Sequence, residues 1–96
     1  MGVEREVRWS DESLSQVKLI KEFIRSQWTE REVLAFLDLL HGFEQLVLQY
    51  PKGYQVSSIY PGCRRAVIHP NVSVVYKVEG KLIEVVTVHD NRSARI

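Results

Sequence analysis

Hydrophobic residues recur every three or four positions between residues 11 and 50, and this spacing predicts two amphipathic helices. Ser10 can cap the first helix, and Asp11 and Glu12 would follow in its first turn, where the helix dipole favours acidic side chains. The apolar stripe of this helix comprises Leu14, Val17, Ile20, Ile24 and Trp28, and is widened by Leu19 and Phe23.

A second helix is predicted to begin almost without a loop at Thr29, which can form a capping box with Glu32. Pro51 ends this helix, and Gly53 follows just beyond it. More than half of the helix circumference is apolar, so the helix must pack on one apolar surface while a second apolar surface packs on it. Because the join at Thr29 is so short, the two helices are expected to form an antiparallel hairpin.

The pattern then changes to that of β-strands. Residues 63–69, 72–78 and 82–88 read as three strands, because turn residues separate them at Pro70-Asn71 and Glu79-Gly80. Short turns between consecutive strands predict an antiparallel meander.

A short strand over residues 6–9 precedes the helices, and residues 51–62 read as a turn-rich connector. The predicted class is therefore α+β, with the order β-α-α-β-β-β. In this arrangement the helical hairpin packs on one face of a small, mostly antiparallel four-stranded sheet. We expect one domain over residues 1–96, in which residues 89–96 form a polar C-terminal tail.

Composition narrows the class of protein. The chain has 96 residues, of which 45% are hydrophobic and 26% charged, as is typical of a globular domain. It has no apolar run of membrane-spanning length and no apolar secretion segment, so a cytoplasmic protein without membrane contact is expected. A single cysteine, Cys63, excludes a disulfide framework, and a buried, inert thiol is the better interpretation.

Charge is divided unevenly along the chain. Residues 1–50 hold six basic and nine acidic residues, a net charge of −3, whereas residues 51–96 hold seven basic and three acidic residues, a net charge of +4. An anionic partner would therefore approach the β-rich half, although strands with lysine and arginine on a solvated face give the same pattern.

The sequence does not predict a cofactor, a metal ion or a small-molecule ligand. Its glycines are scattered, whereas a nucleotide-binding loop needs clustered glycines. His41, His69 and His89 lie far apart on different elements, without the spacing of a metal site.

Basic residues begin the second predicted strand. Arg64 and Arg65 would point to opposite faces of that strand, and Arg65 would share its face with Val67 and His69. Beyond the last strand, residues 89–92 form a polar cluster that can be a solvated terminus or the rim of a site.

Three segments in order carry a family resemblance. These are the run from Tyr60 to Pro70 (YPGCRRAVIHP), the hairpin from Val74 to Gly80 (VVYKVEG) and the exit Asp90-Asn91-Arg92. Together with the helical hairpin, they resemble the RelE/ParE superfamily of toxins from bacterial type II toxin–antitoxin systems, over about residues 5 to 95.

The resemblance implies a toxin that arrests growth when it is freed from a cognate antitoxin. The resemblance does not decide between two targets that members of this plasmid-stabilization superfamily act on. RelE-like members are mRNA interferases, endoribonucleases that cut messenger RNA on the ribosome, whereas ParE-like members inhibit DNA gyrase and are not enzymes. A degenerate, non-toxic member that only binds its antitoxin is the alternative.

The same resemblance suggests site residues. Arg65 and Arg92 match positions where the nucleases use a cation, and His89 lies near a histidine that some members carry. We therefore expect Arg65, His89 and Arg92 to act in catalysis or in target binding. Val67 and Ser73 depart from this pattern, because the nucleases carry cations there, and no aromatic residue follows Arg92.

Overall fold

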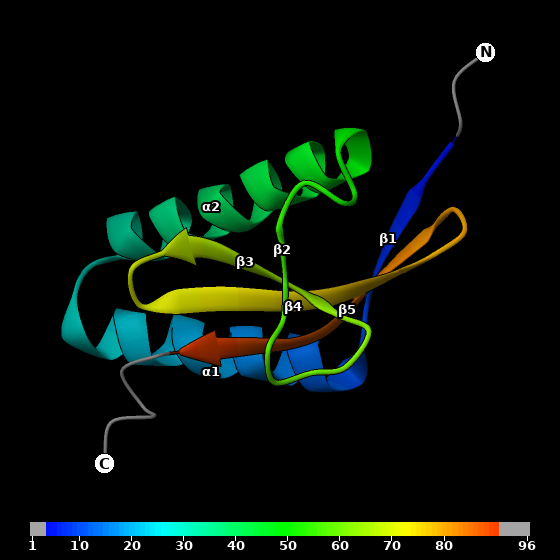
Figure 1. The fold of residues 1–96 in the computed structure, drawn as a ribbon. Helices are drawn as coiled ribbons and strands as arrows, with labels where there is room; N and C mark the ends of the chain where they lie inside the picture. The colour runs from blue at the N-terminus through cyan, green and yellow to red at the C-terminus, as the bar shows by residue number, and fades with distance from the viewer. Residues whose placement is uncertain (1–3, 91–96) are drawn as a thin grey trace.

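The computed structural model describes residues 4–90. Two helices and five strands follow one another along this part of the chain (Figure 1). They are β1 (Glu6–Trp9), α1 (Asp11–Gln27), α2 (Glu30–Gln49), β2 (Gln55–Val56), β3 (Arg64–His69), β4 (Val72–Glu79) and β5 (Leu82–Asp90). Neither of these helices is long and apolar enough to cross a membrane.

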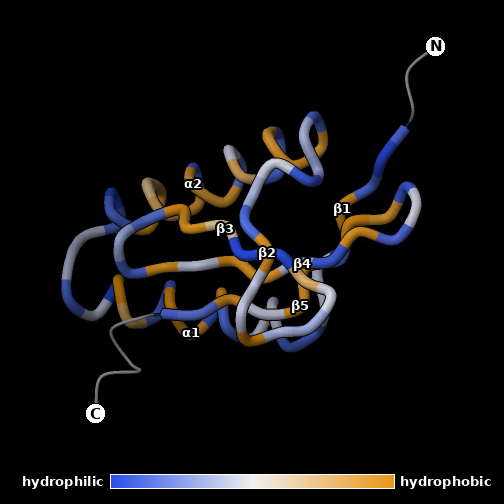
Figure 2. Tube along the Cα trace, viewed as in Figure 1, coloured by the Kyte–Doolittle hydropathy of each residue, from blue (hydrophilic) through white to orange (hydrophobic). Residues whose placement is uncertain are grey.

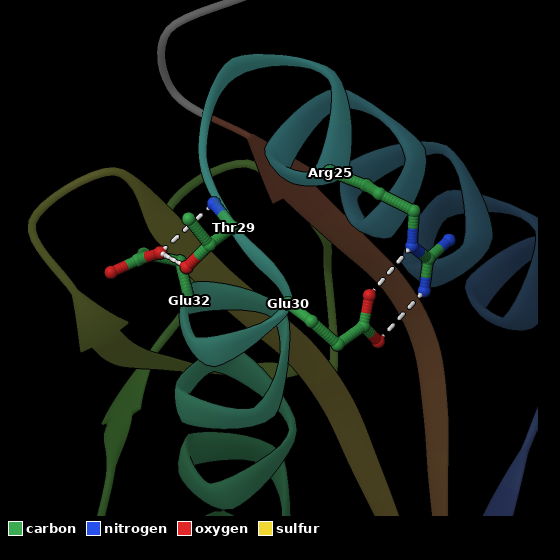
Figure 3. A network of polar contacts seen from close by, with 4 residues as sticks. All are labelled: Arg25, Thr29, Glu30 and Glu32. Carbon is green, nitrogen blue, oxygen red and sulfur yellow. Dashed lines mark hydrogen bonds and ion pairs between the residues drawn. The ribbon is translucent and has the colours of Figure 1, made fainter.

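Both helices begin at the predicted caps. The Ser10 hydroxyl accepts a hydrogen bond from the Ser13 backbone N–H at 3.1 Å and donates one to the Val86 carbonyl at 2.8 Å. At the start of α2 the Glu32 carboxylate accepts hydrogen bonds from the Thr29 hydroxyl and from the Thr29 N–H (Figure 3). These bonds satisfy polar groups at the helix ends and fix where each helix starts.

The join between the helices carries a second polar contact. The Arg25 guanidinium donates to both oxygens of the Glu30 carboxylate, at 3.0 and 3.3 Å (Figure 3). This ion pair lies on the surface, where water screens it, so it orients the join more than it stabilises the fold.

The sheet has five strands in the order β1-β5-β4-β3-β2, so the prediction of four strands was wrong. The missed strand, β2, pairs antiparallel with β3 through Gln55 and Val56 only. Two residues are too few to produce an alternating pattern, so this strand could not be recognised within the predicted connector. The N-terminal strand β1 lies parallel to β5, and the remaining pairs are antiparallel, as expected of a mostly antiparallel sheet.

The last strand extends further than predicted. His89 pairs with Ser73, and Asp90 pairs with Val72, so both belong to β5 and not to a polar tail. The sequence predicted a tail from residue 89 because polar side chains at a strand end resemble a solvated terminus. The remaining residues of the predicted tail, 91–96, lie outside the described residues.

The core lies between the helices and one face of the sheet. Figure 2 shows apolar and polar residues alternating along α1 and α2, as amphipathic helices require. Phe43 of α2 is central to this core, since its ring contacts those of Trp9, Tyr54 and Tyr76. The members with least exposure are Ile20, Val33, Phe36, Phe43, Val47, Ala66, Val72, Val74, Tyr76, Ile83, Val85 and Val88. Leu19 and Phe23, by contrast, are exposed on α1.

The other face of the sheet carries a crossing segment. Residues 57–63, here called the strap, leave β2, pass over β3, β4 and β5, and return to β3 (Figure 1). Its ends are tied by a hydrogen bond from the Ser57 N–H to the Cys63 carbonyl, at 2.8 Å. The sheet therefore has a helix side, which forms the core, and a strap side.

Candidate functional site on the strap side of the sheet

Strand register brings the predicted site residues to one side of the sheet. Arg65 of β3 pairs with Val75 of β4, which in turn pairs with Thr87 of β5. The neighbouring row runs from Val67 through Ser73 to His89. Because residues at alternate positions of a strand share a face, Arg65 and His89 both belong to the strap side, on strands separated by β4.

The adjacent arginines point in opposite directions, as the sequence predicted. Arg64 lies partly buried on the helix side, where it donates a hydrogen bond to the Tyr54 carbonyl at 2.7 Å. Arg65 is exposed, and within residues 4–90 it takes part in neither a hydrogen bond nor an ion pair. Arg64 is therefore a structural residue, whereas the charge of Arg65 is available to a partner.

His89 is held by the strap. Its Nε2 atom and the Tyr60 hydroxyl are 2.9 Å apart, and the two rings lie 5.6 Å apart at a tilt of 39°. Tyr60 was not predicted from the sequence to be a site residue. The sequence feature that could have identified it is an aromatic residue immediately before the Pro61-Gly62 turn, because small and polar residues are the usual ones in turns. Tyr60 is thus a further member of the site.

Between Val67 and His89 lies an unsatisfied polar group. The Ser73 side chain is 0% exposed, and its hydroxyl oxygen has no hydrogen-bond partner. Neighbouring Val75 and Thr87 are also buried on this side of the sheet. The strap and its surroundings thus exclude water from the middle of the sheet face.

Lys77, the strap-side cation of β4, is neutralised. The Lys77 ammonium group lies 3.5 Å from the Glu84 carboxylate and 3.7 Å from that of Glu79. The predicted site residue Arg92 lies outside the described residues, so the structure brings together only Arg65 and His89 of the predicted set.

His69 does not share the face of Arg65, contrary to the prediction. A β-bulge between Val67 and His69 shifts the register with β4, which breaks the alternation of faces. His69 instead lines an open pocket of about 300 Å³ on the helix side. Its largely apolar lining comprises Ile24, Trp28, Glu32, Ala35, Phe36, Leu39, His69, Asn71 and Val72.

Residues 4–90 contain no group of three or more histidine, cysteine, aspartate or glutamate side chains that could hold a metal ion. Cys63 is a buried free thiol, as predicted.

Sequence comparison then decides the family. A family model described as "ParE toxin of type II toxin-antitoxin system, parDE" matches residues 7–94. The chain belongs to the ParE toxin family. The predicted membership of the RelE/ParE superfamily is thereby confirmed, and the protein is a toxin of a type II toxin–antitoxin system.

Solved structures agree with the ParE fold. A chain of the "Chromosomal ParDE TA system from P. aeruginosa" aligns with a TM-score of 0.77 at 16% identity, covering 90% of this chain and 95% of that one. YafQ from E. coli strain BL21(DE3) aligns with a TM-score of 0.66 at 16% identity, covering 97% and 100%. A chain of the E. coli DinJ-YafQ toxin-antitoxin complex aligns with a TM-score of 0.66 at 15% identity, covering 98% and 100%. At these identities the likeness establishes the shared fold, and no curated protein sequence matches this chain.

Proposed function

We propose that this ParE toxin arrests growth by binding and inhibiting a protein target, DNA gyrase, and that a cognate antitoxin keeps it inactive. Gyrase is chosen as the target because the ParE-like members of the superfamily that the sequence resembles inhibit it. One observation on the strap side carries the choice between the two branches. Among the described residues of β3, β4 and β5, Arg65 is the exposed cation without a partner on this side, and its neighbours are the apolar Val67 and the uncharged Ser73.

A nuclease site needs more positive charge than this. Cleavage of RNA builds negative charge on the phosphate, and each preorganised donor that stabilises such charge contributes a few kcal/mol. On the described strap side Lys77 is already paired with two carboxylates, and the exposed Arg8 of β1 lies three strands away from β3, so Arg65 is the unpaired cation beside Val67 and Ser73. A protein target requires no such cluster of cations, because apolar contact and a single arginine can anchor an interface.

Ribosome-dependent cleavage of messenger RNA is the second candidate, and the Tyr60–His89 contact favours it. A phenol and an imidazole in hydrogen-bond contact are groups that can transfer protons to and from a reacting hydroxyl. If this candidate holds, His89→Gln abolishes cleavage, whereas His41→Gln, a matched change on the exposed surface of α2, leaves it intact.

The deciding experiment expresses the toxin without its antitoxin. We expect growth arrest, intact messages by primer extension, and inhibition of supercoiling by purified gyrase. Cleaved messages together with unaffected supercoiling would replace the gyrase proposal with the nuclease. Normal growth would support the alternative that the chain only binds an antitoxin.

We assign the antitoxin to the pocket on the helix side. Trp28 and Leu39 line this pocket and are 51% and 37% exposed, so apolar surface is available to an amphipathic segment of a partner. We expect Leu39→Asp to weaken co-purification with the antitoxin. Leu34→Asp is the matched control, because Leu34 is also exposed on α2 but does not line the pocket.

A further inference from the structure

On β3 and the strap, exposed apolar side chains lie beside the unpaired positive charge of Arg65. Ile59, on the strap, is 76% exposed, and Val67, on β3, is 55% exposed. Arg65 lies two residues before Val67 on β3, so both side chains project from the same side of the sheet.

Register and contacts place these residues close together. Val67 and His89 are separated by one strand, and at the usual strand spacing their Cα atoms lie roughly 10 Å apart. Tyr60 contacts His89, and Ile59 is its neighbour in the chain. The five residues Ile59, Tyr60, Arg65, Val67 and His89 are here called the strap-side patch.

The strap-side patch rests on a well-packed base. Ser73 and Val75 of β4 and Thr87 of β5, which face the same side of the sheet, are 0%, 1% and 2% exposed. The Tyr60–His89 contact ties the strap to β5 across this base. Tyr60 and His89 are therefore held in place before a partner binds, which lowers the entropy cost of binding.

We propose that the strap-side patch is the surface through which the toxin binds its protein target. The inference rests on the proposed function, a protein target, and names the site that contacts it. The chemistry of the patch fits a segment that presents a carboxylate to Arg65 and apolar side chains to Ile59 and Val67. Charge complementarity supports this assignment, because Lys77 has carboxylate partners of its own whereas Arg65 has none among the described residues.

The patch is separate from the proposed antitoxin site. The helix-side pocket is lined by Ile24, Phe36 and Val72, whose side chains belong to the core side of the sheet. Target binding and antitoxin binding thus use different sides of the molecule, and substitutions can separate them.

The test measures inhibition of purified gyrase by full-length toxin variants, together with antitoxin affinity by calorimetry. We expect Arg65→Glu and Ile59→Asp each to weaken inhibition at least about tenfold, as hot-spot substitutions do, with antitoxin affinity unchanged. Arg65→Lys should retain most of the inhibition. The matched control is Lys81→Glu, which makes the same charge change at an exposed residue of the β4–β5 turn, far from the patch.

The outcomes distinguish this inference from the function on which it rests. If wild-type toxin inhibits gyrase and Arg65→Glu does so as well as Lys81→Glu, the strap-side patch is not the docking surface. If wild-type toxin does not inhibit gyrase, the proposed function fails and this inference fails with it. Circular dichroism confirms folding, and the exposure of Arg65 and Ile59 makes both changes compatible with the native fold.

Discussion

The Tyr60 hydroxyl lies 2.9 Å from Nε2 of His89, although 29 residues separate the two along the chain. The contact joins the strap to the last strand, at the side of the sheet where the site residues lie. Ser73, Val75 and Thr87 lie buried on the same side of the sheet. The position of His89 therefore depends on the strap as well as on β5.

Removing the Tyr60 hydroxyl tests this dependence. Tyr60→Phe keeps the ring contact with His89 but removes the hydrogen bond, so we expect the free energy of unfolding to fall by about 0.5 to 1 kcal/mol. Urea denaturation measures the change. Tyr50→Phe is the control, because the Tyr50 side chain is 62% exposed and lies outside the strap. Equal stability of the two variants would mean that the contact does not anchor the strap.

The buried hydroxyl of Ser73 gives the opposite prediction. This oxygen is removed from water without a hydrogen-bond partner, which costs about 1 to 3 kcal/mol. Ser73→Ala should therefore raise the free energy of unfolding by about 1 kcal/mol, once the small cavity that it leaves is taken into account. Thermal denaturation followed by circular dichroism measures the effect. A destabilised alanine variant would show that the hydroxyl is satisfied in solution.

Sequence periodicity was sufficient for the helices, because each buries one stripe and has clear capping residues. It was insufficient where long-range pairing decides the structure. Gln55 and Val56 form a strand only because Arg64 and Arg65 lie beside them, and no pattern within two residues reports this. The bulge that turns His69 to the helix side is equally invisible, since it arises from register with β4.

The candidate site was predicted in part for the same reason. Alternation along β3 was enough to separate Arg64 from Arg65, a local property of one strand. Tyr60 was missed because its partner, His89, is distant in sequence and the strap has no periodic signal. Residues that a loop brings onto a sheet can be found only from the folded structure.

Phe43 should be the residue whose truncation most damages the core. Its side chain is 2% exposed and contacts three aromatic rings, from β1, from the segment before β2 and from β4. We expect Phe43→Ala to lower the free energy of unfolding by about 3 to 5 kcal/mol, because a large cavity would remain. Chemical denaturation measures this loss. Phe23→Ala is the control, since Phe23 is 41% exposed on α1, and its loss should be much smaller.

Burial of Tyr76 should make the fold sensitive to alkali. Removal from water raises the pKa of the Tyr76 phenol to about 12, an effect that the charge of Arg64 partly opposes. In the unfolded chain the phenol ionises near pH 10, so above that pH the unfolded state loses a proton that the native state keeps. The free energy of unfolding is therefore unaffected by this group below pH 10 and falls as the pH rises from 10 to 12. The total loss from Tyr76 is roughly 2 to 3 kcal/mol.

The variant Tyr76→Phe separates this effect from general alkaline denaturation. At neutral pH it loses the 2.8 Å hydrogen bond to the Pro51 carbonyl and should be less stable by about 1 kcal/mol. Between pH 10 and 12 its stability should fall less steeply than that of the wild type, because the phenol that ionises on unfolding is gone. Tyr54, whose pKa burial also raises, remains in both proteins, so the difference between the two slopes reports Tyr76 alone. Urea midpoints measured at several pH values give both slopes, and parallel curves would show that Tyr76 ionises equally readily in the native and unfolded states.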